Sequence, residues 1–458
     1  MDAISFGTSG WRATLDVFTA PRVRMVGQAV ADYLDDEGRA GDPVAIGYDA
    51  RESSRGFVEE LARVMAANGH DVLLPARDCP TPMVAHAIVT RELAGGLVVT
   101  ASHNPPEYNG VKFFPASGAP SMPTITAAIE ANLREPVVAP EHEWGAIREV
   151  DFVEPHLDAV LELLDPDLDG LTVVYDAMYG SGRGVTDRLL ERAGAKVVCL
   201  HCDRDPEFGG TAPEPSRDRL QPLVEAVREE DADLGVANDG DADRVAIVTP
   251  ERGFLDENFF FAAAYDYLLE SDSGPAVRTV STTFLIDRVA AAHGEEVIET
   301  PVGFKWVADA LREHDALMGG EESGGFTMRG HVPTKDGVLM ALLAATADSE
   351  RSLDDRVDAL LAEHGDVYQD KVSVDCPDAE KSRVLGDLEG SFPETVAGRA
   401  VQEINPADGV KALLEDGSWI LIRPSGTEPK LRVYAEGASE AAVEELLAAG
   451  RDLVEPLV

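Results

Sequence analysis

Cysteine and long apolar runs are scarce in this sequence. Its 458 residues include four cysteines, which are too few for a disulfide framework in a chain of this length. No run of about 18 apolar residues occurs, so the sequence predicts no membrane span. Residues 1–6 contain neither the basic start nor the apolar core of a secretion signal. We therefore expect a cytoplasmic protein with no membrane partner.

Basic charge is also scarce. Lysine and arginine total 39 against 84 acidic residues, a net charge of -45, and only eight of the basic residues are lysine. Such a chain repels nucleic-acid phosphates and anionic membranes, so we expect no nucleic-acid partner. The acidic residues are spread through helix-like segments such as 224–231, which favours a solvated coat over an acidic ligand-binding surface. Because salt screens this self-repulsion, we predict that folding requires molar salt.

Three stretches share one pattern. Residues 44–74, 171–200 and 277–298 each contain a strand, a loop, a helix, a glycine and a second strand, and 44% of the whole chain is apolar. The strands are nearly all apolar, which is typical of a sheet covered on both faces. A glycine after each helix predicts a left-handed C-cap. We predict three tandem, similar α/β domains within about three or four domains in all.

The end of the chain has a different pattern. Short alternating strands are expected at 409–414, 418–423 and 430–434, with a final helix from about residue 440. This pattern predicts a smaller α+β domain. The expected boundaries are 1–150, 151–254, 255–370 and 371–458.

A candidate reactive hydroxyl follows the strand expected at 95–100. In the stretch TASHNPPEYNGVK, Ser102 stands where strand becomes loop, beside His103 and near Lys112. An ordinary turn serine is the alternative interpretation.

Elsewhere, Cys199 and Cys202 form a lone C-x-x-C, which is compatible with a zinc or redox site. Without a second ligand pair, coincidence at a strand end is the favoured interpretation.

The stretch NDGDADR places three carboxylates on one short loop. Asp239, Asp241 and Asp243 repel one another unless a hard cation lies between them. An EF-hand loop is excluded, because Arg244 stands where glycine is required and Pro250 where glutamate is required. A polar turn in an acid-rich chain is the alternative. A cation beside a guanidinium suits a phosphate, which favours a metal site.

Two further loops are rich in polar residues. In RPSGTEPK, Arg423 and two hydroxyls on a tight turn form a plausible phosphate cradle. In GGEESGG, the side chains of Glu321, Glu322 and Ser323 suit sugar hydroxyls, and a hinge or linker is the alternative.

Together with FGTSGWR at residues 6–12, these four loops resemble the signature loops of the α-D-phosphohexomutase family, in family order. The resemblance covers essentially the whole chain. It implies three α/β/α domains with mixed sheets and a smaller C-terminal α+β domain around a central cleft, with one loop per domain. Phosphoglucomutases, phosphomannomutases and phosphoglucosamine mutases belong to this family. The acidic coat and scarce lysine resemble proteins of salt-accumulating halophilic archaea.

The resemblance also implies a mechanism. Ser102 resembles the family's phosphoserine, which passes its phosphate to a hexose monophosphate. The bound hexose 1,6-bisphosphate, also the activator, reorients and returns its other phosphate, so phosphate moves between C1 and C6. Asp239, Asp241, Asp243 and a phosphoserine oxygen match the ligands of Mg²⁺. The other matching residues are Arg12 and Arg244 at the transferred phosphate, Lys305, Glu321 and Ser323 at the substrate, and Arg423, Ser425, Gly426 and Thr427 at the distal phosphate.

One position departs from several bacterial members, which carry histidine where this chain has Gly325. The general acid/base is therefore open among Lys335, His103 and Lys112, each of which is otherwise a phosphate-binding cation. Glucose is the favoured sugar, mannose is compatible, and glucosamine remains an alternative. A metal-dependent sugar phosphatase and an inactive sugar-phosphate binding protein are further alternatives. Intact Ser102 argues against the inactive protein, and the sequence does not indicate an oligomeric state.

Overall fold

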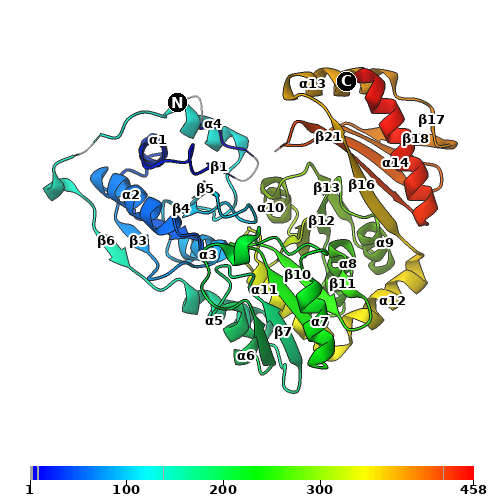
Figure 1. The fold of residues 1–458 in the computed structure, drawn as a ribbon, viewed down its shortest axis with the longest axis horizontal. Helices are drawn as coiled ribbons and strands as arrows, with labels where there is room; N and C mark the ends of the chain where they lie inside the picture. The colour runs from blue at the N-terminus through cyan, green and yellow to red at the C-terminus, as the bar shows by residue number, and fades with distance from the viewer. Residues whose placement is uncertain (1–3, 8–9, 138, 427) are drawn as a thin grey trace.

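The computed structural model describes residues 4–7, 10–137, 139–426 and 428–458, whose strands form four sheets (Figure 1). The sheet of domain I has the order β1-β5-β4-β2-β3-β6. Its strands are β1 (Trp11–Thr14), β2 (Val44–Tyr48), β3 (Val72–Leu74), β4 (Gly95–Val99), β5 (Tyr108–Pro115) and β6 (Ile147–Glu149). Its helices are α1 (Ala20–Asp36), α2 (Ser54–Ala67), α3 (Thr81–Thr90) and α4 (Pro123–Ala131). No helix in the described ranges is long and apolar enough to cross a membrane.

Domains II and III follow with smaller sheets, ordered β11-β10-β9-β7-β8 and β13-β12-β14-β15. The strands are β7 (Thr172–Asp176), β8 (Lys196–Leu200), β9 (Leu234–Asn238), β10 (Val245–Thr249), β11 (Gly253–Leu255), β12 (Ala276–Thr279), β13 (Val297–Thr300), β14 (Met318–Glu321) and β15 (Gly325–Met328). The helices are α5 (Val153–Leu164), α6 (Thr186–Arg192), α7 (Gln221–Glu229), α8 (Glu257–Leu269), α9 (Leu285–His293), α10 (Phe304–Glu313), α11 (Gly337–Glu350) and α12 (Leu353–His364).

One strand order recurs in these three sheets. The orders β5-β4-β2-β3, β10-β9-β7-β8 and β15-β14-β12-β13 superimpose strand for strand. In each of these orders, the first two strands form an antiparallel hairpin, and the remaining neighbouring strands are parallel. The predicted tandem repeat of three similar α/β domains with mixed sheets is therefore confirmed.

The strand pattern explains how each sheet is covered. In domain I, Val44 and Ile46 of β2 face a core shared with α1 and α2, while Ala45 faces the core that contains α3. Because strand side chains alternate between faces, a continuous apolar strand requires a helix layer on both sides. β8 departs from this prediction, since it lies at the edge of its sheet and exposes Lys196 and Cys199.

The predicted glycine caps are present. Gly69, Gly194 and Gly294 follow α2, α6 and α9 with φ of +90°, +109° and +79°. Only a residue without a Cβ adopts this left-handed conformation at little cost, so each glycine ends its helix and turns the chain back to the sheet.

Domain IV is an antiparallel sheet, as the short alternating strands predict. Its order is β16-β21-β20-β19-β18-β17, and it has its own apolar core. The strands are β16 (Tyr368–Asp375), β17 (Thr395–Val396), β18 (Arg399–Asn405), β19 (Val410–Leu414), β20 (Trp419–Pro424) and β21 (Lys430–Gly437). The helices are α13 (Asp378–Ser391) and α14 (Glu440–Val454), and α14 begins where the sequence predicts.

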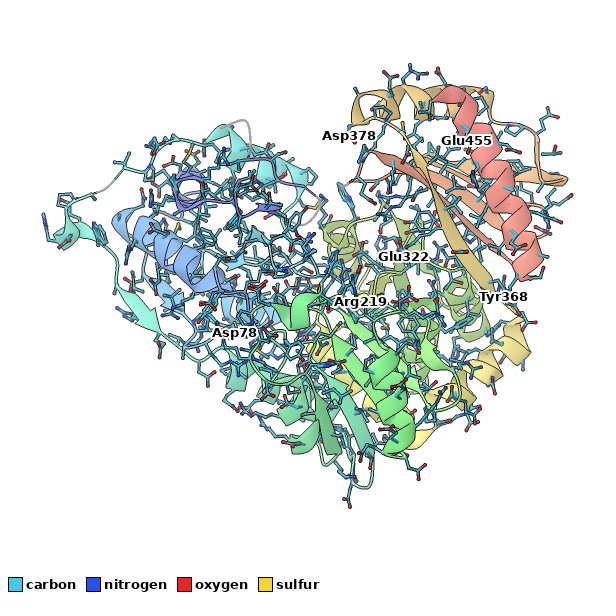
Figure 2. The ribbon with its side chains drawn as sticks, in the orientation of Figure 1. Asp78, Arg219, Glu322, Tyr368, Asp378 and Glu455 are labelled. Atoms are coloured by element: carbon cyan, nitrogen blue, oxygen red, sulfur yellow. The ribbon has the colours of Figure 1, made fainter. Side chains whose placement is uncertain are left out.

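Domains I to III share one core, whereas domain IV attaches at one side. The nearly all-apolar α11 is buried along most of its length within that shared core. Asp78, labelled in Figure 2, forms an ion pair with Arg183 at 2.7 Å across the junction of domains I and II. Domain IV reaches domain III through a Lys411–Glu299 ion pair at 2.5 Å. In Figure 1 domain IV lies against domain III and apart from domain I.

Candidate active site

Three of the four candidate loops occupy equivalent places in the repeat. Each connects the two strands of the antiparallel hairpin: β4 to β5 carries Ser102, β9 to β10 carries the three aspartates, and β14 to β15 carries Glu322 and Ser323. The loops therefore leave corresponding ends of corresponding strands. Packing the domains around one core brings the first two loops into direct contact.

Ser102 is held in a strained turn. It is fully buried and has a φ of +53°, in the left-handed region that residues with a Cβ rarely adopt. Its backbone nitrogen donates to Thr100 Oγ1 at 2.8 Å, and Thr100 in turn donates to Asp49. Arg51 donates to the Ser102 carbonyl at 2.9 Å and pairs with Asp49. These contacts stabilise a conformation that the serine would not adopt alone.

The serine hydroxyl points at the aspartate loop. Ser102 Oγ donates to Asp239 Oδ2 at 2.7 Å. The approach of the two loops is close, since a Cβ on Gly240 would lie 2.6 Å from the Ser102 carbonyl oxygen. Lys112 Nζ bridges Asp241 and Asp243 at 2.7 and 2.9 Å. The structure thus brings the predicted serine, lysine and three aspartates into one cluster.

This cluster fits a hard divalent cation. The three aspartates are buried, and one carboxylate oxygen from each lies within 4.8 Å of the others. Burial, together with the charges of Asp241 and Asp243, raises the pKa of Asp239 to about 7. Asp241 Oδ1 is buried without a hydrogen-bond partner in the described part of the chain. An all-oxygen donor set with an unsatisfied oxygen suits Mg²⁺ better than a softer metal.

Lys335 enters the cluster from domain III. Its Nζ donates to Asp243 Oδ1 at 3.0 Å. Its aliphatic stem passes beside Gly325, where a Cβ would lie 2.2 Å from Lys335 Cδ. Nearby, Glu321 accepts a hydrogen bond from the Gly303 backbone at 2.9 Å, and burial raises the pKa of this carboxyl. Ser323 is exposed on the same loop.

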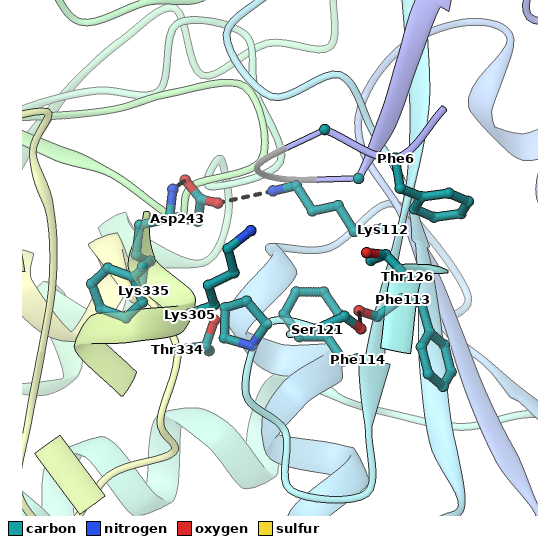
Figure 3. Close-up of a pocket in the computed structure, with 14 residues that line it drawn as sticks. Phe6, Lys112, Phe113, Phe114, Ser121, Thr126, Asp243, Lys305, Thr334 and Lys335 are labelled. Carbon is teal, nitrogen blue, oxygen red and sulfur yellow. Dashed lines mark hydrogen bonds and ion pairs between the residues drawn. The ribbon is translucent and has the colours of Figure 1, made fainter. Parts of the chain in front are cut away.

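A cleft opens beside this cluster between domains I and III. Lys112, Lys305 and Lys335 all line it, together with Asp243 and aromatic side chains such as Phe114 (Figure 3). Three of the chain's eight lysines therefore meet in one cleft. In a chain of net charge -45, such a cluster marks a site for an anion.

His103, Arg12 and Arg244 lie beside the cluster. His103 Nδ1 is 3.4 Å from Ser102 Oγ, and burial, with the charges of Arg244 and Arg12, lowers the pKa of His103 to about 2. A neutral imidazole is a poor proton donor here. Arg12 donates to Asn104 Oδ1 at 3.1 Å, and Arg244 Nε lies 4.0 Å from Asp243 Oδ1.

The fourth loop is not part of this cleft. Arg423 Nε donates to Asp408 Oδ2 at 2.9 Å, so this contact holds the guanidinium against another residue of domain IV. Ser425 is buried, and Gly426 is exposed. None of these residues lines the cleft between domains I and III. Thr427 lies outside the described residues.

Sequence reasoning missed the residues that position these loops. Asp49 and Arg51 hold the serine loop, and Thr81 donates to Asp241 Oδ2 at 2.6 Å. In domain IV, Asp408 orients Arg423, and Lys381 donates to the Ser425 carbonyl at 2.7 Å. Asp49 and Arg51 directly follow the apolar strand β2, a position where polar residues of parallel sheets gather. The others carry no comparable local pattern.

Comparison with known proteins agrees with the four-domain fold. The phosphoglucomutase/phosphomannomutase family models match domain I over residues 3–137, domain II over 154–253, domain III over 256–364 and the C-terminal domain over 372–453. A Methanopyrus kandleri protein named "Probable phosphoglucosamine mutase" is 34% identical, with 96% of this chain and 95% of that protein covered.

Two further relatives have different names. A phosphoglucomutase/phosphomannomutase of Thermococcus kodakarensis is 32% identical, with 98% of both chains covered. A crystal structure of a Thermus thermophilus protein described as a "putative phosphomannomutase" is 31% identical with a TM-score of 0.85, and 99% of both chains is covered. The chain therefore belongs to the phosphoglucomutase/phosphomannomutase family and is a phosphotransfer isomerase.

Proposed function

We propose that this enzyme interconverts hexose 1-phosphate and hexose 6-phosphate, with Ser102 as the phosphoryl carrier. The observation that carries the proposal is the 2.7 Å contact of Ser102 Oγ with Asp239 inside the aspartate cluster. Asp239, Asp241, Asp243 and a phosphoserine oxygen would hold Mg²⁺. When bound, this ion offsets negative charge on the transferring phosphoryl group.

The chemistry requires two balanced transfers. In the first, a hydroxyl oxygen of the hexose monophosphate bonds to phosphorus, the phosphorus–oxygen bond to Ser102 breaks, and the hydroxyl proton passes to a base. After the bisphosphate reorients, Ser102 Oγ bonds to the second phosphorus and the sugar oxygen leaves with a proton. Arg12 and Arg244 lie near the cluster and would balance charge on the phosphoryl oxygens.

Lys335 is our choice for the acid/base among the three candidates. The pKa of His103 is too low for proton transfer near neutral pH. Although burial acts in the opposite direction, contacts with Asp241 and Asp243 raise the pKa of Lys112 and keep it charged. Lys335 lines the cleft, and among the described residues it forms an ion pair with one carboxylate, Asp243.

The substrate would extend from this cluster toward domain IV. Lys305, Glu321 and Ser323 would bind sugar hydroxyls. The fourth loop would hold the distal phosphate through Arg423, Ser425, Gly426 and Thr427. A mutase needs this second phosphate site to retain the bisphosphate, whereas a phosphatase does not. We propose four functional units, residues 1–150, 151–254, 255–370 and 371–458. The strands extend slightly past two of these boundaries, since β11 of domain II ends at Leu255 and β16 of domain IV begins at Tyr368.

Glucose is the sugar we propose, with mannose as a second substrate. Both present hydroxyls to a Glu-x-Ser loop and differ at C2. Glucosamine is the second candidate, because relatives of similar length and identity are named as phosphoglucosamine mutases. Hexose 1,6-bisphosphate would be the activator, since it regenerates the phosphoserine.

A phosphomutase assay tests this proposal. Glucose 1-phosphate would be incubated in molar KCl with Mg²⁺ and a trace of glucose 1,6-bisphosphate, with mannose 1-phosphate and glucosamine 1-phosphate in parallel. We expect glucose 6-phosphate to form fastest and the Ser102→Ala variant to lose activity by at least about 10³-fold, since the carrier is absent. Release of free phosphate in place of the isomer would indicate a phosphatase. Unchanged turnover by Ser102→Ala would refute Ser102 as the carrier.

A further inference from the structure

A second cluster of metal-ligand atoms lies on domain II. The Sγ atoms of Cys199 and Cys202 and one carboxylate oxygen of Asp187 all lie within 4.8 Å of one another. Cys199 is on the edge strand β8, Cys202 is in the turn that follows, and Asp187 is in the first turn of α6. The sequence shows only a C-x-x-C pair, and the fold adds a third ligand to it.

The spacing of these atoms is compatible with their sharing one cation. Cys199 Sγ lies 3.9 Å from Asp187 Oδ2. Around a tetrahedral Zn²⁺, a sulfur and a carboxylate oxygen are about 3.6 Å apart, and two sulfurs are about 3.8 Å apart. A shift of a few tenths of an ångström in the aspartate side chain closes this gap. The observed sulfur–oxygen distance is too long for a strong hydrogen bond, since a thiol is a weak donor.

The aspartate has unused coordination capacity. Its Oδ1 is buried and has no hydrogen-bond partner within the described ranges. A buried carboxylate oxygen without a partner is costly, and a bound cation would satisfy it. Cys199 is exposed, which leaves an entry path from solvent and a fourth position for water.

The two cysteines are free thiols in this structure. A soft or borderline cation displaces thiol protons, whereas Mg²⁺ does not bind sulfur appreciably. The two sulfurs therefore select a different ion from the all-oxygen aspartate cluster.

We propose that Cys199, Cys202 and Asp187 form a site for a thiophilic divalent cation of the Zn²⁺ class, distinct from the catalytic cation. This ion would join α6 to the turn after β8. That turn is linked to the loop after β7 by a hydrogen bond from the Tyr179 backbone nitrogen to the His201 carbonyl at 2.9 Å. The site would therefore stabilise domain II without contacting the substrate.

Cobalt absorption provides a direct test. The fully reduced, full-length protein would be titrated with Co²⁺ in the absence of oxygen, with Mg²⁺ in excess to occupy the aspartate cluster. Only sulfur ligands produce thiolate-to-cobalt charge-transfer absorption, so the oxygen ligands of the catalytic cluster do not contribute. We expect one equivalent of Co²⁺ to produce this absorption and Zn²⁺ to abolish it by displacement.

Variants assign the ligands. Cys199→Ser and Cys202→Ser should lose the charge-transfer absorption, and Asp187→Asn should weaken Co²⁺ binding at least tenfold. The exposed Glu225→Gln on α7, which packs on the other face of the domain II sheet, is the carboxylate control and should bind as the wild type does. Phosphomutase activity of Cys199→Ser should be unchanged, which shows that this variant is folded.

Three results would overturn the proposal. The first is no charge-transfer absorption at saturating Co²⁺ in the reduced wild type. The second is unchanged absorption in Cys199→Ser. The third is a mass loss of two hydrogens in air, showing a disulfide, in a protein whose reduced form takes up no metal. That last outcome would make the pair a redox site instead.

Discussion

At the scale of single residues, the position of the Lys335 side chain depends on the absence of a Cβ at Gly325. A Cβ at position 325 would lie 2.2 Å from Lys335 Cδ and 2.9 Å from its Cγ. The space beside the sugar loop therefore holds either a side chain at 325 or the lysine stem. Glycine at this position therefore leaves room for the stem of Lys335, which reaches the cluster from another segment.

Gly325→Ala tests this dependence. The lysine stem is flexible, so we expect the variant to fold and to displace Lys335 Nζ from Asp243. A displacement of about 1 Å in a catalytic group lowers turnover by up to roughly 10²-fold. The measurement is the kcat for glucose 1-phosphate, with the melting temperature as a check of folding.

Gly386→Ala is the matched control. Gly386 lies inside α13, has open space around its Cα and does not adopt a positive φ. Alanine there should leave kcat unchanged and stabilise the helix by about 0.5–1 kcal/mol. Wild-type turnover by Gly325→Ala would show that the position of Lys335 does not limit catalysis.

At the scale of elements, a histidine cluster joins three domains. His156 of α5 and His331 of domain III both contact Asp336 Oδ2, at 2.6 and 2.7 Å. Asp336 also caps α11 by accepting from the backbone of Val338 at 2.9 Å. Its placement next to Lys335 means that the cap also positions the lysine. His86 of α3 packs edge-on against His156, with ring centroids 5.5 Å apart.

This cluster predicts a loss of stability in mild acid. Burial, followed by the neighbouring His156 and His331, lowers the pKa of His86 to about 4, and Asp336 and Arg91 are the other charged groups near it. The unfolded chain binds this proton near pH 6.5, so stability decreases as the pH falls from 6.5 toward 4. The melting temperature of the wild type should fall by about 2–4 °C more than that of His86→Gln between pH 7 and about pH 5.

Salt must be held constant in that comparison, because the surface charge also changes with pH. His142→Gln is the control, since the His142 side chain is 79% exposed. The melting temperature of His142→Gln should change with pH as that of the wild type does. Equal pH dependence in His86→Gln and the wild type would show that another group causes the acid sensitivity.

At the scale of the whole molecule, charge is distributed unevenly. Acidic residues outnumber basic ones by 84 to 39, and exposed carboxylates such as Asp378 and Glu455 are labelled at the edge of the molecule in Figure 2. The scarce lysines concentrate at contacts that orient other groups: Lys112 and Lys335 at the aspartates, Lys381 at the fourth loop and Lys411 at the junction of domains III and IV. A surface of predominantly negative charge leaves the lysine-lined cleft as the place where an anionic sugar phosphate is bound most favourably.

This charge predicts that the fold depends on salt. The excess acidic side chains, which give the net charge of -45, repel one another over about 30 Å at 0.01 M salt but over only about 3 Å at 1 M. Circular dichroism should show the helical signal in molar KCl and its loss in dilute buffer. Sucrose stabilises folded proteins without screening charge, so as a control it should restore less structure than KCl does. Full retention of structure in dilute buffer would contradict the prediction.

Local patterns in the sequence were sufficient to predict the three α/β repeats, the α+β end and the loops that carry Ser102 and the aspartates. Apolar strands, glycine caps and turn residues act within a few residues, so they can be read along the chain. The tertiary structure decided which of these residues meet. The Ser102 loop and the aspartate loop leave corresponding ends of their hairpins, and packing of the domains brings Ser102 against Asp239. The packing of domain III brings Lys335 into contact with Asp243 of the same loop.

Other pairings have no trace in sequence spacing. Arg51, which is 51 residues from Ser102 in the sequence, donates a hydrogen bond to the Ser102 carbonyl. Asp187 lies beside Cys199 and Cys202 only because α6 packs against the edge strand β8. The fourth loop lies outside the cleft of domains I and III, because it belongs to domain IV, which packs against domain III through a separate apolar cluster of Val280 with Trp419 and Leu421. Side-chain contacts between distant segments depend on how the layers pack, and this information is spread over the whole chain.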